Sequence, residues 1–119
     1  MNSGERAGKG VFLDRIIHEP ARLQIISYLA AKGKTVAFTE LNERLGLSSG
    51  NLSVQLKRME EAQYVSITKS FKNNRPLTTV SLTYQGLEAL RQYLGELEFM
   101  IRDVRDAVSM PEDGGKSKY

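Results

Sequence analysis

The residue types that carry most enzyme and metal chemistry are nearly absent from this sequence. It contains no Cys and a single His, His18, so disulfides, thiolate nucleophiles and Cys-based metal sites are excluded. The neighbours of His18 predict a structural or solvent-facing position at a helix end. The acid pairs Glu60–Glu61 and Asp103–Asp106 fall on polar helix faces, and no Gly-rich phosphate loop follows a predicted strand. We therefore expect no catalytic residues, no metal and no cofactor.

The side chains that remain are small polar and basic ones, and they gather in the middle of the sequence. Residues 48–83 carry 5 Lys or Arg against 2 acids, whereas residues 84–119 carry 5 against 7, and the net charge is +3. A basic middle can face a polyanion while an acidic end points elsewhere. This asymmetry is typical of a nucleic-acid-binding protein.

Length and composition predict one domain whose first half is built from short helices. With 119 residues, 40% of them hydrophobic, the chain has room for a single core. Apolar residues at helical spacing predict four helices, over residues 11–17, 21–32, 40–45 and 49–62. Thr39 is expected to cap the third helix and Ser48 or Ser49 the fourth. The last two, joined by a tight turn at Gly46, form a helix-turn-helix pattern.

Two β-rich runs follow and predict a hairpin. Residues 64–71 and 77–83 mix apolar and polar side chains as a half-exposed hairpin requires. The connector, residues 72–76, contains Asn73 and Asn74, which tolerate positive φ, and Pro76, which lacks a ladder donor. We therefore expect a projecting turn over residues 72–76 rather than continued strands.

The last predicted element is a long amphipathic helix with Thr83 as its N-cap. A sustained heptad places apolar residues at Leu87, Leu90, Leu94, Leu97, Ile101, Val104 and Val108. A helix of about 25 residues is roughly 37 Å long, more than one small core covers. We therefore assign all of these residues except Leu87 to a homodimer interface, with the relative direction of the two helices open. The alternative is that the whole stripe packs on the chain's own core.

Three segments resemble a known family. Residues 38–53, 56–65 and 81–86 are similar to the second helix, the recognition helix and the junction before the last helix in MarR- and ArsR-type winged-helix regulators. Gln63 departs from the Gly common in these families. The resemblance and the element order together imply a mainly α (α+β winged helix) fold, with a three-helix helix-turn-helix core, a two-stranded β-wing and a long C-terminal dimerisation helix. The DNA-binding domain would span residues 11–83 and the dimerisation helix residues 84–109, with disordered tails at 1–10 and 110–119.

In such a fold the helix that begins near Ser49 enters the major groove of DNA. Helical geometry places Leu52, Leu56 and Met59 on the buried edge. The groove-facing candidates are Ser48, Ser49, Gly50, Asn51, Ser53, Val54, Lys57 and Arg58. The wing candidates are Lys69, Lys72, Asn73, Asn74 and Arg75. The competing interpretations are a solvated helix face and a hairpin whose charges only keep it soluble.

These predictions point to a cytoplasmic, sequence-specific double-stranded DNA-binding transcriptional regulator. It would act as a homodimer on an inverted-repeat operator, and we expect a repressor. The alternative is a winged-helix module for protein or RNA interaction. No apolar segment resembles a signal peptide or a membrane span. Tyr93, Phe99 and Met100 beside the dimer seam are interpreted as packing rather than as a small-molecule pocket, and no effector is assigned.

Overall fold

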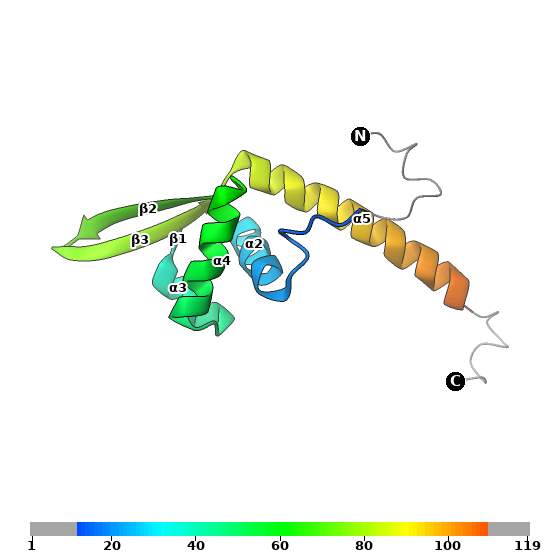
Figure 1. The fold of residues 1–119 in the computed structure, drawn as a ribbon, viewed down its shortest axis with the longest axis horizontal. Coiled ribbons are helices and arrows are strands. Elements are labelled where there is room, and N and C mark those ends of the chain that lie inside the picture. Colours follow the sequence, from blue (N-terminus) through cyan, green and yellow to red (C-terminus); the bar gives the residue numbers. More distant parts are fainter. Residues whose placement is uncertain (1–11, 110–119) are drawn as a thin grey trace.

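The computed structural model describes residues 12–109 of the chain. Helices α2 (Pro20–Lys32), α3 (Phe38–Leu45) and α4 (Ser49–Glu61) form the body, and α5 (Tyr84–Val108) follows a β-hairpin. In Figure 1 the hairpin and the distal half of α5 extend from this body in opposite directions. The predicted winged-helix class, with a helix-turn-helix core and a long C-terminal helix, is confirmed.

The sheet has three strands rather than the two predicted from the sequence. Strands β2 (Val65–Lys72) and β3 (Arg75–Leu82) form the hairpin, and β1 (Val36–Ala37) pairs with the other edge of β3 to give the order β1-β3-β2. All pairings are antiparallel. A two-residue strand is too short to show an alternating pattern, and its pairing with Val80 and Thr79 is a long-range event that local sequence does not display.

The hairpin turn is tighter than the predicted connector of residues 72–76. Lys72 pairs with Arg75, so only Asn73 and Asn74 form the turn, and their φ angles of 53° and 63° are those of a type I′ turn. The expectation that Pro76 lies outside the strand is wrong, since it pairs with Phe71 within β3. Next to a two-residue turn this second pair is a non-hydrogen-bonded one, so the missing N–H of proline costs no bond to β2.

Helix ends follow local chemistry with two exceptions. The N-cap of α4 is Ser48, whose hydroxyl accepts from the Asn51 N–H at 3.1 Å. The predicted cap at Thr39 is wrong, because Ala37 holds the N-cap position of α3 in the extended conformation that β1 requires. The predicted helix over residues 11–17 is also wrong in the part that the structure describes. There the Asp14 carboxylate accepts from the N–H groups of residues 16 and 17 and holds a turn.

The hydrophobic core lies between the body helices, the sheet and the first half of α5. Its fully buried side chains are Ile17, Ile25, Ile26, Leu29, Val36, Leu41, Leu52, Met59 and Val80. Helix α5 adds Leu90 and Tyr93, which are 5% and 2% exposed. The assignment of Leu90 to the dimer seam is therefore corrected, because this side chain is already enclosed by its own subunit. Tyr93 likewise packs in the core rather than lining a pocket between subunits.

Candidate nucleic-acid interface

Helix α4 presents one apolar edge to the core and leaves the opposite side uncovered. Leu52, Leu56 and Met59 are buried, as their spacing predicts. The groove-facing candidates from Ser48 to Arg58 are all exposed, including Val54 at 57%. A Cβ added at Gly50 would meet nothing within 4 Å. Within residues 12–109 the chain itself therefore does not block access to this side of α4.

The first turn of α4 is anchored to α3 by a short hydrogen-bond chain. Asn42 donates through Nδ2 to the carbonyl of Leu47 and accepts through Oδ1 from the Ser49 hydroxyl at 3.1 Å. Gly46, with φ of 66°, ends α3 and directs the chain into this turn. The helix-turn-helix geometry is thus held by side chains as well as by the apolar contacts beneath it.

A second chain of hydrogen bonds connects α4 to the N-terminal part of the body. Arg22 is only 8% exposed and donates to the carbonyl of Ile16 and to Oε1 of Gln55, each at 2.6 Å. Gln55 in turn donates to Oδ1 of Asn51 at 3.0 Å. Sequence reasoning did not identify Arg22 or Gln55, because a buried arginine 33 positions from its partner leaves no periodic signal.

The wing is basic and projects freely. Every residue from Thr68 to Pro76 is exposed, which includes all five wing candidates. Lys72 and Arg75 lie opposite each other where the strands meet the turn. Phe71, at 75% exposed, lies beside them. This aromatic side chain was not singled out from the sequence, although an apolar residue one position from a predicted turn is a usable signal.

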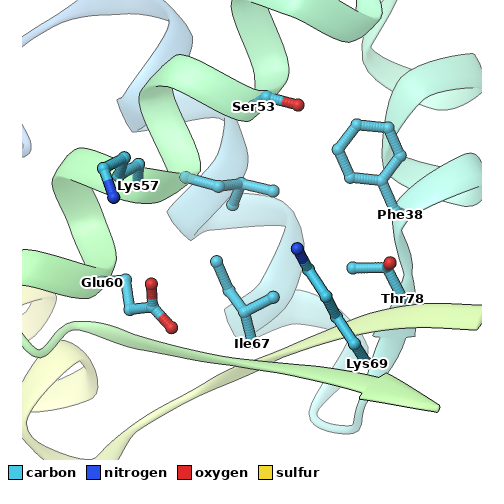
Figure 2. Close-up of a pocket in the computed structure, with 8 residues that line it drawn as sticks. Phe38, Ser53, Lys57, Glu60, Ile67, Lys69 and Thr78 are labelled. Atoms are coloured by element: carbon cyan, nitrogen blue, oxygen red, sulfur yellow. The ribbon is translucent and has the colours of Figure 1, made fainter.

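A hollow of about 630 Å³ separates α4 from the wing. Figure 2 shows Lys69 rising from β2 into this space, with Phe38 and Ile67 forming part of its wall. Lys57 lines it from α4, and Glu60, one turn further along the helix, is the acid on its lining. The structure thus brings together two cations that the sequence assigned to separate elements, and the hollow they line is open to solvent.

Two titratable groups of the body, Glu40 and Tyr64, have pKa values shifted by their contacts. Hydrogen bonds from Tyr28 and then Lys32, together with the nearby lysine charges, lower the pKa of Glu40 below its ordinary value, although desolvation opposes them. This cluster connects the end of α2 to α3. Burial, and then its hydrogen bond to Asp14, raises the pKa of Tyr64 to about 12.

The distal half of α5 offers a second exposed face, of apolar character. Leu94, Ile101, Val104 and Val108 are 44–61% exposed. Leu97 is half-buried against the core of its own subunit. Every residue from Ile101 to Ser109 is exposed, so no described part of the chain covers this end of the helix.

The sequence of the body and of most of α5 matches a known family. Residues 21–101 match the family described as winged helix DNA-binding domain. The chain belongs to this family. The uncharacterized protein MJ0432 of Methanocaldococcus jannaschii is 31% identical over 83 residues, covering 70% of this winged-helix chain and 89% of that protein. The prediction of a winged helix-turn-helix regulator is confirmed at the level of this family.

Solved structures show the same winged-helix fold. The transcriptional regulator homologue protein from Pyrococcus horikoshii OT3 aligns with a TM-score of 0.72 at 26% identity, covering 87% of this chain and 98% of that one. The heme sensor protein PefR from Streptococcus agalactiae, solved with heme, aligns with a TM-score of 0.68 at 19% identity, covering 94% and 74%. At that identity the second likeness concerns the fold alone. The family and the Pyrococcus structure support a DNA-binding transcriptional regulator.

Two features are absent from the described residues of the winged-helix domain, and the contact of the single histidine is a structural one. Among residues 12–109 there is no group of three or more His, Cys, Asp or Glu that could hold a metal ion. In the same range no helix has the length and apolar content needed to cross a bilayer. His18 donates to or accepts from the hydroxyl of Tyr93 at 2.8 Å, which is a structural contact between the N-terminal turn and α5.

Proposed function

We propose that this winged-helix protein is a repressor that binds double-stranded DNA sequence-specifically as a homodimer. The observation that carries the proposal is the uncovered small polar side of α4, flanked by a hollow that contains Lys57 and Lys69. The major groove admits one α-helix, and serine, asparagine and a valine methyl group are suited to base edges. Gly50 at the start of α4 lets the backbone approach the groove closely.

The geometry supports a division of labour between base reading and backbone contact. With α4 in the major groove, the sugar-phosphate backbone beside that groove would pass through the hollow between α4 and the wing. Lys57 and Lys69 could then neutralise phosphates from its two sides. Lys72 and Arg75 would lie further along the duplex at the wing tip, where phosphate contacts position the protein without carrying sequence information.

The exposed apolar stripe of α5 supports the proposed homodimer. Leu94, Ile101, Val104 and Val108 repeat at heptad spacing and have no cover within the described chain. A second copy presents the same stripe, so a two-fold pair is the simplest way to remove it from water. Two recognition helices related by a two-fold axis would require an operator that is an inverted repeat. Occupancy of such a site would exclude other proteins from it, which is why repression is the proposed sign.

The test joins selection of bound duplexes from a random pool with sedimentation of interface variants. The parent should select one inverted repeat and sediment as a dimer. The double variant Ile101→Asp, Val104→Asp should be a folded monomer with weak DNA binding, because both side chains are exposed in the single chain. The control, Arg102→Ala with Asp103→Ala, removes two outward charges on the same turn and should remain dimeric.

Two results would count against the proposal. A double variant that still sediments as a dimer would refute the α5 interface. A parent that selects no duplex sequence would favour the alternative of a module for protein or RNA interaction.

A further inference from the structure

The side chain of Asn51, in the first turn of α4, is part of a hydrogen-bond chain whose direction is fixed at its buried end. That end is Arg22, whose guanidinium group carries only donors and cannot accept a hydrogen bond. Its Nη1 lies 2.6 Å from the terminal amide of Gln55. The atom of Gln55 that faces Arg22 must therefore be the oxygen, Oε1, and the Nε2 group must point the other way.

The orientation of the Gln55 amide then sets that of Asn51, which lies one helical turn earlier in α4. Gln55 Nε2 lies 3.0 Å from the amide of Asn51 and donates to it, so the atom of Asn51 that faces Gln55 is Oδ1. Reversing the Gln55 amide would lose both bonds, whereas reversing the Asn51 amide alone would place donor against donor and lose the bond between Gln55 and Asn51. The Nδ2 group of Asn51 is left on the outer side of an exposed residue, and within residues 12–109 it makes no hydrogen bond.

We propose that Arg22, acting through Gln55, orients the Asn51 amide so that it offers hydrogen-bond donors to the major groove and selects a base with a keto oxygen. The proposal rests on the proposed function, in which α4 enters that groove. At the groove edge guanine presents two acceptors, O6 and N7, and thymine presents the acceptor O4, whereas cytosine presents the donor N4 and adenine combines the acceptor N7 with the donor N6. Arg22 and Gln55 are positioning residues, and Asn51 is the residue that touches the base.

A second chain of hydrogen bonds, from Ser49 through Asn42 to Leu47, runs in the opposite direction, toward the body. An outward-facing donor is therefore a property of Asn51 and is not shared by Ser49. The carbonyl of Leu47 can only accept, so Asn42 turns its Nδ2 toward it and its Oδ1 toward the Ser49 hydroxyl. Ser49 consequently donates inward and exposes acceptor lone pairs. The two polar residues at the start of α4 thus present different hydrogen-bonding groups, each set by a partner that cannot reverse.

The decisive variant is Gln55→Glu, which keeps the size of the side chain and its acceptor toward Arg22. A carboxylate has no donor for Asn51 Oδ1, so the Asn51 amide reverses, donates to Glu and exposes its oxygen. Selection from a random duplex pool should show a keto base preferred by about fivefold at one position in the parent, the fold-change of one net hydrogen bond. In this variant the preference should change to adenine or cytosine. Asn51→Ala should abolish it and so identify the position.

Two further measurements separate this inference from its alternatives. Gln24→Glu places the same added charge at an exposed site on α2 and should leave the preference unchanged. In the DNA-free protein, NMR should show one Gln55 side-chain amide proton exchanging with water more slowly than those of Asn51, because only Gln55 donates.

A keto preference that persists in Gln55→Glu, or equal exchange of the two amides, would overturn the inference while leaving DNA binding intact. A parent that selects no duplex would instead overturn the proposed function, and this inference with it.

Discussion

Gly86 lies at the start of α5, where this helix packs against the base of the wing. Replacing Gly86 with alanine should push the start of α5 away from the wing. A Cβ at this position would be 2.2 Å from the carbonyl oxygen of Tyr64 and 2.8 Å from Cδ1 of Leu82. The oxygen belongs to backbone that is already held by a hydrogen bond from Thr83 N–H at 3.0 Å. Since the backbone cannot rotate away as a side chain would, the start of α5 must move.

The expected loss of stability follows from three contributions. Overpacking against a fixed neighbour costs up to about 3 kcal/mol, and loss of the Thr83–Tyr64 hydrogen bond costs about 1 kcal/mol more. Alanine recovers about 1 kcal/mol of helix propensity relative to glycine. The Gly86→Ala variant should therefore have a free energy of unfolding lower by about 3 kcal/mol, a large part of the stability of a domain of this size.

Gly95 supplies the control in the same helix. An added Cβ there would meet nothing within 4 Å, so Gly95→Ala should raise the free energy of unfolding by about 1 kcal/mol. Urea unfolding followed by circular dichroism would measure both variants at one protein concentration, because the apparent stability of a homodimer depends on concentration. A Gly86→Ala protein as stable as the parent would refute the close approach of α5 to Tyr64.

Two other predictions concern the wing and the base of the hairpin. Replacing Lys72 and Arg75 together with Gln should weaken binding to all duplex sequences and reduce the slope of log affinity against log salt by about 1.8, at about 0.9 for each phosphate contact. An unchanged slope would show that neither Lys72 nor Arg75 contacts a phosphate. Because the pKa of Tyr64 is raised to about 12 from an ordinary value near 10, its contribution to stability should be complete below pH 10 and should be lost as the pH rises toward 12. Tyr64→Phe should remove this alkaline decrease in Tm, and parallel curves for the two proteins would contradict it.

Features controlled by neighbouring residues were predictable from the sequence. The ends of α2 and α3 at Gly33 and Gly46, both with φ of 66°, follow from the backbone freedom of glycine. The paired asparagines at the hairpin turn and the cap of α5 at Thr83 are likewise local. The buried edge and the exposed polar side of α4 follow from helical periodicity alone, so the candidate recognition residues could be named in advance.

Features that join distant segments were not predictable in this way. Strand β1 exists because β3 presents a free edge to Val36 and Ala37, and this pairing also moves the start of α3 away from the expected cap. Pro76 is tolerated inside β3 because the register directs its missing N–H away from β2. Neither property can be read from the residues themselves, since both depend on which strand lies alongside.

The sequence alone determined that a polar helix, a basic hairpin and an apolar heptad exist in this protein, because periodicity and capping act over a few residues. The tertiary structure decided how each is used. It enclosed Leu90 in the core while leaving Ile101, on the same apolar heptad stripe, exposed. It also placed Lys57 opposite Lys69 across one hollow. It also brought Arg22 against Gln55 and so gave the Asn51 amide a direction. These outcomes depend on packing between segments that are far apart in the chain, where the spacing of residue types carries no information.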